Sequence, residues 1–382
     1  MPQTSNVQRA ARPTRAMPAL KQTLLALTAL SFAAGAAHAE GSSVTLYGFI
    51  DLGLFHTNNA GANAQSLTTM GQAGGNYFPS MFGFTGSEDL GGGMKAGFNL
   101  QSSIDAANGT QSGNGLFDRY ATVSLSGSAG SLELGRQIDL IFLQAFLNGV
   151  MPSHANSLAV NGLLAYGGGS TSAAAANQGS AIATVDSSRI SNAMTYTTPS
   201  VSGFTGKLMY ALGGVAGSQS ANSLYSGVVT YSGAIDGNAL NLSAGYESQN
   251  SPTGASNTFS ETLLGAKYSI AGFDLAAQYI GYKSADSTVN ANGYELGAAY
   301  HVAPSTTVGL NYEDVQDKAN NLSPKVVTLK GKYELSKRTY LYGMLAGYNK
   351  AAAGTFLQGY ATTLGSAGTS ATNFALGVVH GF

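Results

Sequence analysis

Along almost the whole chain, large or apolar side chains alternate with small or polar ones. Tyr294 and Leu296 fall on one face of a segment, for example, while Glu295 and Gly297 fall on the other. A period of two is that of a β-strand with two unlike faces. Such strands can form a soluble sandwich with one buried face, or a closed barrel with one face in lipid and the other in water.

The number and spacing of these segments favour the barrel. We count sixteen, and an even count suits a closed antiparallel barrel. They begin near residues 44, 77, 94, 117, 131, 189, 203, 223, 239, 259, 272, 292, 305, 325, 338 and 373. Short links such as 88–93 alternate with long ones such as 57–76, 104–116 and 138–188. Short turns at one end and long loops at the other are typical of outer-membrane barrels.

The first residues have the features of an export signal. Lys21 precedes an apolar run from Leu24 to Ala37, and Ala37-His38-Ala39 offers a cleavage site. The run spans about 14 residues, short of the roughly 20 that a membrane-spanning helix needs. We therefore predict a signal peptide at 1–39, with Met17 as a possible true start, and a single barrel domain at 40–382.

Composition supports a chain that meets lipid. Only 10% of residues are charged, against about 25% in soluble domains. The leader carries four basic residues and no acid, so its removal changes the formal charge from −1 to −5, which argues against nucleic acid as a partner. Because sixteen strands enclose more space than their own side chains fill, we expect an aqueous channel.

Motifs spread over the mature chain resemble the general-diffusion porins of Gram-negative bacteria, most closely the beta-proteobacterial branch. Each motif is short, but together and in order they are specific. They are Ser43 to Asp51, Gly83 to Ala96, Phe117 to Gly127, Leu132 to Gln137, Arg189 to Asn192, Thr198 to Phe204 and Phe374 to Phe382.

The resemblance implies a sixteen-stranded antiparallel transmembrane β-barrel that assembles as a homotrimer in the outer membrane, in contact with lipid and lipopolysaccharide. It also implies that the third external loop, residues 138–188, folds inward and narrows the pore to an eyelet. Phe382 matches the family's carboxy-terminal assembly signal. By position, Arg119, Arg136 and Arg189 match wall arginines of the eyelet, with Asp139 at the start of the loop.

Two departures from the family concern this eyelet. Met81 stands where the family commonly has an arginine, and the loop has no Asp or Glu between Asp139 and Asp186. The charge balance of the eyelet therefore leans positive. This predicts a weak preference for anions.

The expected function is passive diffusion of ions and small hydrophilic solutes, without catalysis, cofactor or metal. The alternative is a substrate-selective channel with a binding track that includes Tyr47 and Phe49. An outer-membrane hydrolase is a third hypothesis, but the chain has no Cys, and its mature histidines are scattered: His56, His154, His301 and His380. We expect these histidines to be unpaired surface or girdle residues.

Aromatic residues at segment ends should form interfacial girdles: Tyr77, Phe78, Tyr268, Phe273, Tyr282 and Phe382.

Overall fold

The structure, a computed structural model, describes residues 43–60, 65–71, 76–112, 115–153, 188–250, 257–355 and 369–382. The predicted signal peptide, the alternative start at Met17 and most of the loop 138–188 lie outside these ranges. So does His154.

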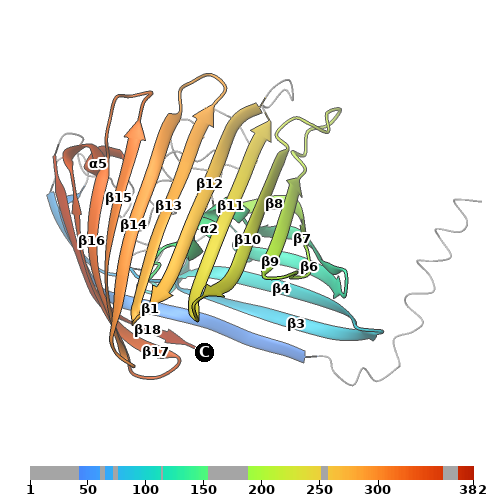
Figure 1. The fold of residues 1–382 in the computed structure, drawn as a ribbon, viewed down its shortest axis with the longest axis horizontal. Helices are drawn as coiled ribbons and strands as arrows, with labels where there is room; N and C mark the ends of the chain where they lie inside the picture. Colours follow the sequence, from blue (N-terminus) through green and yellow to red (C-terminus); the bar gives the residue numbers. More distant parts are fainter. Residues whose placement is uncertain are drawn as a thin grey trace, which may run out of the picture. The chain divides into compact units, whose positions relative to one another are not determined.

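The described ranges form one antiparallel sheet in which sixteen long strands follow the order of the chain and close on themselves (Figure 1). Strand β1 pairs with β3 on one side and with β18 on the other, so the sheet has no free edge there. Because a closed barrel pairs every strand with two neighbours, its backbone groups are satisfied within hydrocarbon. The predicted closed sixteen-stranded barrel is confirmed. The long strands are β1 (Ser43–Ala60), β3 (Met81–Gly91), β4 (Met94–Asp105), β6 (Tyr120–Gly127), β7 (Gly130–Ile138), β8 (Arg189–Thr197), β9 (Phe204–Ala211), β10 (Leu224–Ile235), β11 (Asn238–Asn250), β12 (Asn257–Ile270), β13 (Phe273–Ser284), β14 (Asn290–Ala303), β15 (Thr306–Asp317), β16 (Lys325–Glu334), β17 (Thr339–Tyr348) and β18 (Ala371–Gly381).

Four shorter elements accompany the barrel strands. Strand β2 (Gln65–Met70) folds back on β1 inside the predicted long connection 57–76, and β5 (Thr110–Gln111) pairs with the end of β4. Helix α2 (Leu140–Asn148) follows β7, and α5 (Lys350–Thr355) follows β17. Within the described part of the chain, no helix is both long enough and apolar enough to cross a membrane.

Side chains alternate across the wall as the sequence predicts. Leu296 and Leu310 point outward and are 59% and 50% exposed, while Glu295 and Asn311 on the same strands are buried on the inner face. The turns at one end are tight: Asp236-Gly237 and Ala271-Gly272 have positive φ at both positions. This is the type I′ geometry that suits the twist of two-residue hairpins.

The predicted aromatic girdle is wrong for three of its six members. Tyr77 and Tyr282 are buried, and Phe78 packs against the interior cluster that contains Tyr77. Tyr77 and Phe78 precede β3, which begins at Met81 rather than near residue 77, and Tyr282 lies on the inner face of β13. Aromatic residues fill the interior as well as the interface, so their position near a strand end does not reveal which way they point.

Candidate functional site

A short segment that follows β7 lies on the inner face of the barrel. Residues 139–153, hereafter the inner segment, begin with Asp139, whose carboxylate accepts a hydrogen bond from Phe142 N (2.7 Å) and caps helix α2. The helix contacts strands β10 to β13. Asp139 is therefore used in starting the helix, and its carboxylate interacts electrostatically with that of Glu247.

Glycines on the inner face of the wall make room for the inner segment. A Cβ at Gly297 would lie 2.6 Å from Val150 Cγ2, and one at Gly309 would lie 2.7 Å from Met151 Sδ. Real Cβ atoms do not approach so closely, so a larger residue at either position would displace the segment. Four such pairs follow one another: Gly245 with Ile141, Gly265 with Asn148, Gly297 with Val150, and Gly309 with Met151.

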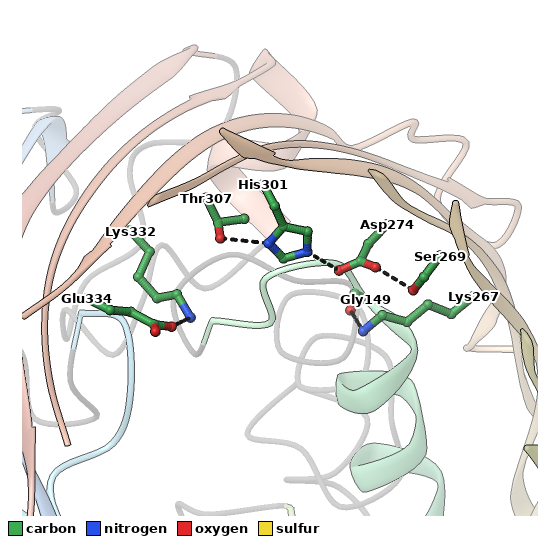
Figure 2. A network of polar contacts seen from close by, with 8 residues as sticks. All are labelled: Gly149, Lys267, Ser269, Asp274, His301, Thr307, Lys332 and Glu334. Atoms are coloured by element: carbon green, nitrogen blue, oxygen red, sulfur yellow. Dashed lines mark hydrogen bonds and ion pairs between the residues drawn. The ribbon is translucent and has the colours of Figure 1, made fainter. Parts of the chain in front are cut away.

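Two lysines of the same wall bind the backbone of the inner segment. Lys267 Nζ donates to Gly149 O (3.2 Å; Figure 2), and Lys330 Nζ donates to Met151 O (3.3 Å). Lys330 is 1% exposed and interacts electrostatically with Glu295 and Glu313. A buried ammonium is tolerated only beside such compensating charges.

Amide side chains complete this wall. Gln278 Nε2 donates to Glu295 Oε2 (2.7 Å) and to Ala145 O of helix α2 (3.1 Å), and Asn311 Nδ2 donates to Glu295 Oε1 (2.6 Å). The Glu295 carboxylate is thus engaged by two donors and one nearby lysine. We name the set Lys267, Gln278, Glu295, Glu313 and Lys330 the lysine wall.

Two of the predicted eyelet arginines meet around one tyrosine. Arg119 immediately precedes Tyr120, and the Arg189 guanidinium lies over the Tyr120 ring, 5.5 Å from its centroid. Arg119 Nε donates to Gln101 Oε1 (2.8 Å), and Gln101 Nε2 donates to the Tyr47 hydroxyl (3.0 Å). We name Tyr47, Gln101, Arg119, Tyr120 and Arg189 the arginine wall.

The other predicted eyelet residues take different places. Arg136 pairs in register with Ala121, on the opposite face from Tyr120, and donates to Asp118 O and Ser191 Oγ. Met81 is buried on the inner face, opposite Phe49 in the sheet register.

The interior also carries a polar network near the short turns (Figure 2). Asp274 accepts from Ser269 and pairs with His301 Nε2 (3.2 Å), and His301 Nδ1 lies 3.2 Å from Thr307 Oγ1. The expectation that His301 is unpaired is wrong. Its partner lies on the adjacent strand, 27 positions away in sequence, where only the register reveals it.

Several residues of both walls were missed by the sequence reasoning. Gln101, Lys267 and Gln278 lie outside the recognised motifs, and Tyr120 lies within the motif Phe117 to Gly127 but was not singled out. The one signal available in the sequence was the alternation of side chains along each strand, which places these residues on the inner face. Within the described ranges, no group of three His, Cys, Asp or Glu side chains is arranged to hold a metal.

Phe382 lies where the barrel closes. Its backbone exchanges two 3.1 Å hydrogen bonds with Gly48, and its ring covers that glycine so closely that a Cβ there would collide with the ring edge. The side chain is 42% exposed.

A closed antiparallel barrel with an apolar exterior and a charged interior defines a transmembrane pore of the outer-membrane class. The family model described as Gram-negative porin matches residues 26–353. The chain belongs to this family and is an outer-membrane protein, as its motifs predict.

Similar proteins and solved structures support the same family assignment. The chain is 34% identical to outer membrane porin protein 32 of Delftia acidovorans over 375 residues, covering 95% of this chain and 100% of the relative. It is 36% identical over 197 residues to an outer membrane porin protein of Bordetella pertussis, covering 48% of this chain and 46% of that relative. The solved anion-selective porin from Comamonas acidovorans is 27% identical, with a TM-score of 0.73 over 89% of this chain and 100% of that one.

Proposed function

We propose that the barrel is a water-filled channel for passive diffusion of ions and small hydrophilic solutes, weakly preferring anions and working without a cofactor or covalent chemistry. The observation that carries the sign of the preference is the pair Arg119 and Arg189 beside Tyr120 on the inner face. The similar structure from Comamonas acidovorans is described as anion-selective, which supports the same sign here.

Local pairing explains why the arginines should outweigh the many interior carboxylates. Glu295 accepts from Gln278 and Asn311, and with Glu313 it faces Lys330, so this wall compensates its own charge. Arg189 forms no ion pair with any carboxylate of the described residues. Since charges in a narrow lumen are screened less than at an open surface, a small imbalance there biases permeation.

The test is a reversal potential in a potassium chloride gradient. We expect anion preference in the parent and a shift toward neutrality in Arg119→Ala/Arg189→Ala. Arg338→Ala is the matched control, because Arg338 is exposed in the turn before β17 and salt screens it. Cation preference in the parent, or an unchanged potential in the double variant, would contradict the assignment.

Assembly as a homotrimer within lipid and lipopolysaccharide belongs to the same proposal. Apolar residues on the outer face of β1, such as Leu46 and Leu54, are exposed and could pack against a neighbouring barrel. Unheated gels should show about three times the monomer mass, and a monomer in mild detergent would refute the trimer.

Deleting Phe382 should leave periplasmic aggregate, whereas normal amounts of heat-modifiable trimer would refute its role in assembly.

A further inference from the structure

His301 lies on the inner face of the barrel, next to the turn that joins β14 to β15. Its neighbours along the strand, Tyr300 and Val302, are exposed on the outer face, so alternation points His301 toward the lumen. The imidazole is 50% exposed; its Nε2 lies 3.2 Å from Asp274 Oδ2 on β13, and its Nδ1 lies 3.2 Å from Thr307 Oγ1 on β15. The ring is therefore anchored on both sides and still open to solvent.

Both partners of His301 suit either charge state of the ring. A neutral imidazole has one N–H donor and one acceptor nitrogen, whereas an imidazolium has two donors. The Asp274 carboxylate accepts in both states, and the Thr307 hydroxyl either donates or accepts. A proton can thus be gained or lost without breaking either contact.

The network around His301 contains two anions and two cations (Figure 2). Asp274 and Glu334 carry negative charge, and Lys267 and Lys332 carry positive charge. Lys332 Nζ lies 2.7 Å from Glu334 Oε1. With His301 neutral these formal charges cancel, so one proton on the imidazole leaves the network with a net positive charge.

Other charged groups on the neighbouring inner faces are farther away or buried. Glu295 is six positions from His301 on β14, and Glu313 is six positions from Thr307 on β15, about 20 Å along each strand. Lys330 on β16 is 1% exposed and interacts with both carboxylates. Histidine is the side chain that ordinarily changes charge between about pH 5 and pH 8, and His301 is the one histidine of the network in Figure 2.

We infer that His301 makes the ion selectivity of the channel depend on pH, with anions favoured more strongly as the pH falls from about 7.5 to about 5. Protonation adds a positive charge beside the lumen, and this charge attracts anions and repels cations. Because outer-membrane barrels place their short turns on the periplasmic side, His301 responds to the pH of the periplasm. The inference rests on the proposed diffusion channel and adds to it a residue that determines specificity.

Reversal potentials in a potassium chloride gradient, measured at about pH 7.5 and about pH 5, test the inference. In the parent, we expect the ratio of chloride to potassium permeability to rise roughly twofold at the lower pH, the order expected of one unit charge acting through water over about 10 Å.

Two variants isolate the imidazole from other groups that titrate in this range. His301→Gln removes the titrating group, and His301→Lys keeps a positive charge at both pH values. The pH response should be largely lost in both, with His301→Lys preferring anions more than His301→Gln at each pH. Either variant tests the inference if the other fails to fold.

His380→Gln is the matched control. His380 also contacts a hydroxyl, with its Nδ1 2.8 Å from Thr339 Oγ1, but it lies on the outer face of β18, in line with exposed Leu376 and Val378. This variant should keep the full pH response of the parent.

The outcomes separate the two proposals. A conducting parent whose permeability ratio responds to pH no more than that of His301→Gln would overturn the role of His301 and leave the diffusion channel standing. A response that is lost in His380→Gln would also overturn it. A parent that forms no channel at all would refute the proposed function itself.

Discussion

The arginine wall and the lysine wall both place cations inside the barrel, but the two sets of cations have different surroundings. Lys267 and Lys330 reach backbone carbonyls of the inner segment, and Lys330 also faces buried carboxylates. Arg189 lies over a tyrosine ring and donates to its neighbour Ser188. Lysine is a compact charge on a flexible stem, whereas arginine is a planar fork that stacks. An interior lysine that binds backbone carbonyls holds the inner segment in place, whereas an interior arginine without a carboxylate partner can act on passing ions. The partners of each cation therefore indicate its role.

The largest effect should come from Lys330→Met. Removing this buried ammonium leaves Glu295 and Glu313 without their cation and frees Met151 O. Breaking a buried charge group by removing one partner costs about 3 to 5 kcal/mol. Urea unfolding of the refolded barrel should show this loss, followed by circular dichroism because the chain has no Trp. An unchanged free energy of unfolding would show that Lys330 does not stabilise the barrel.

A smaller effect is expected from Gly297→Leu. The new side chain would occupy the space of Val150, costing about 1 to 3 kcal/mol through overpacking and pushing the inner segment into the lumen. Single-channel conductance should fall. Gly347→Leu is the control, since a Cβ there meets nothing within 4 Å. Equal conductance in the two variants would mean that the glycines do not seat the segment.

Met81→Arg should increase the difference between the two walls by adding a cation near the arginine wall. Met81 lies on the inner face opposite Phe49 in the register, near the arginine wall, and the change restores the residue common in the family. We expect stronger anion preference with the lysine wall undisturbed. The reversal potential measures this preference, and an unchanged potential would show that position 81 does not face the conducting path.

The smallest effect should come from Lys332→Met. Lys332 pairs with Glu334 at 2.7 Å, but the two side chains are 27% and 44% exposed, so the pair stabilises by less than about 1 kcal/mol. Any change in selectivity should be present at low salt and vanish at high salt. A stability loss as large as that of Lys330→Met would remove the distinction between buried and exposed lysines.

The sequence by itself determined the barrel. Alternation is a local property, and each strand pairs with its neighbours in the chain, so the number of strands, their order and their inner faces could be predicted. Fourteen of the sixteen predicted starts lie within two residues of those observed, and only the second and fourth strands deviate by more, since they begin at Met81 and Tyr120. The family and the outer-membrane location followed from motifs in the same strands.

Only the tertiary structure decided what meets inside the lumen. Lys330 reaches Met151 across 179 positions, and Arg189 covers Tyr120 only after β6, β7 and β8 are in register. Likewise, Tyr77 is buried because its ring packs on those of Tyr340 and Tyr342 of β17. Such contacts depend on the register between neighbouring strands, which is how far each strand is shifted along the next one. These shifts add up around the closed sheet, so contacts between distant strands cannot be derived from any one segment. The alternation of side chains, in contrast, can be read within each strand by itself.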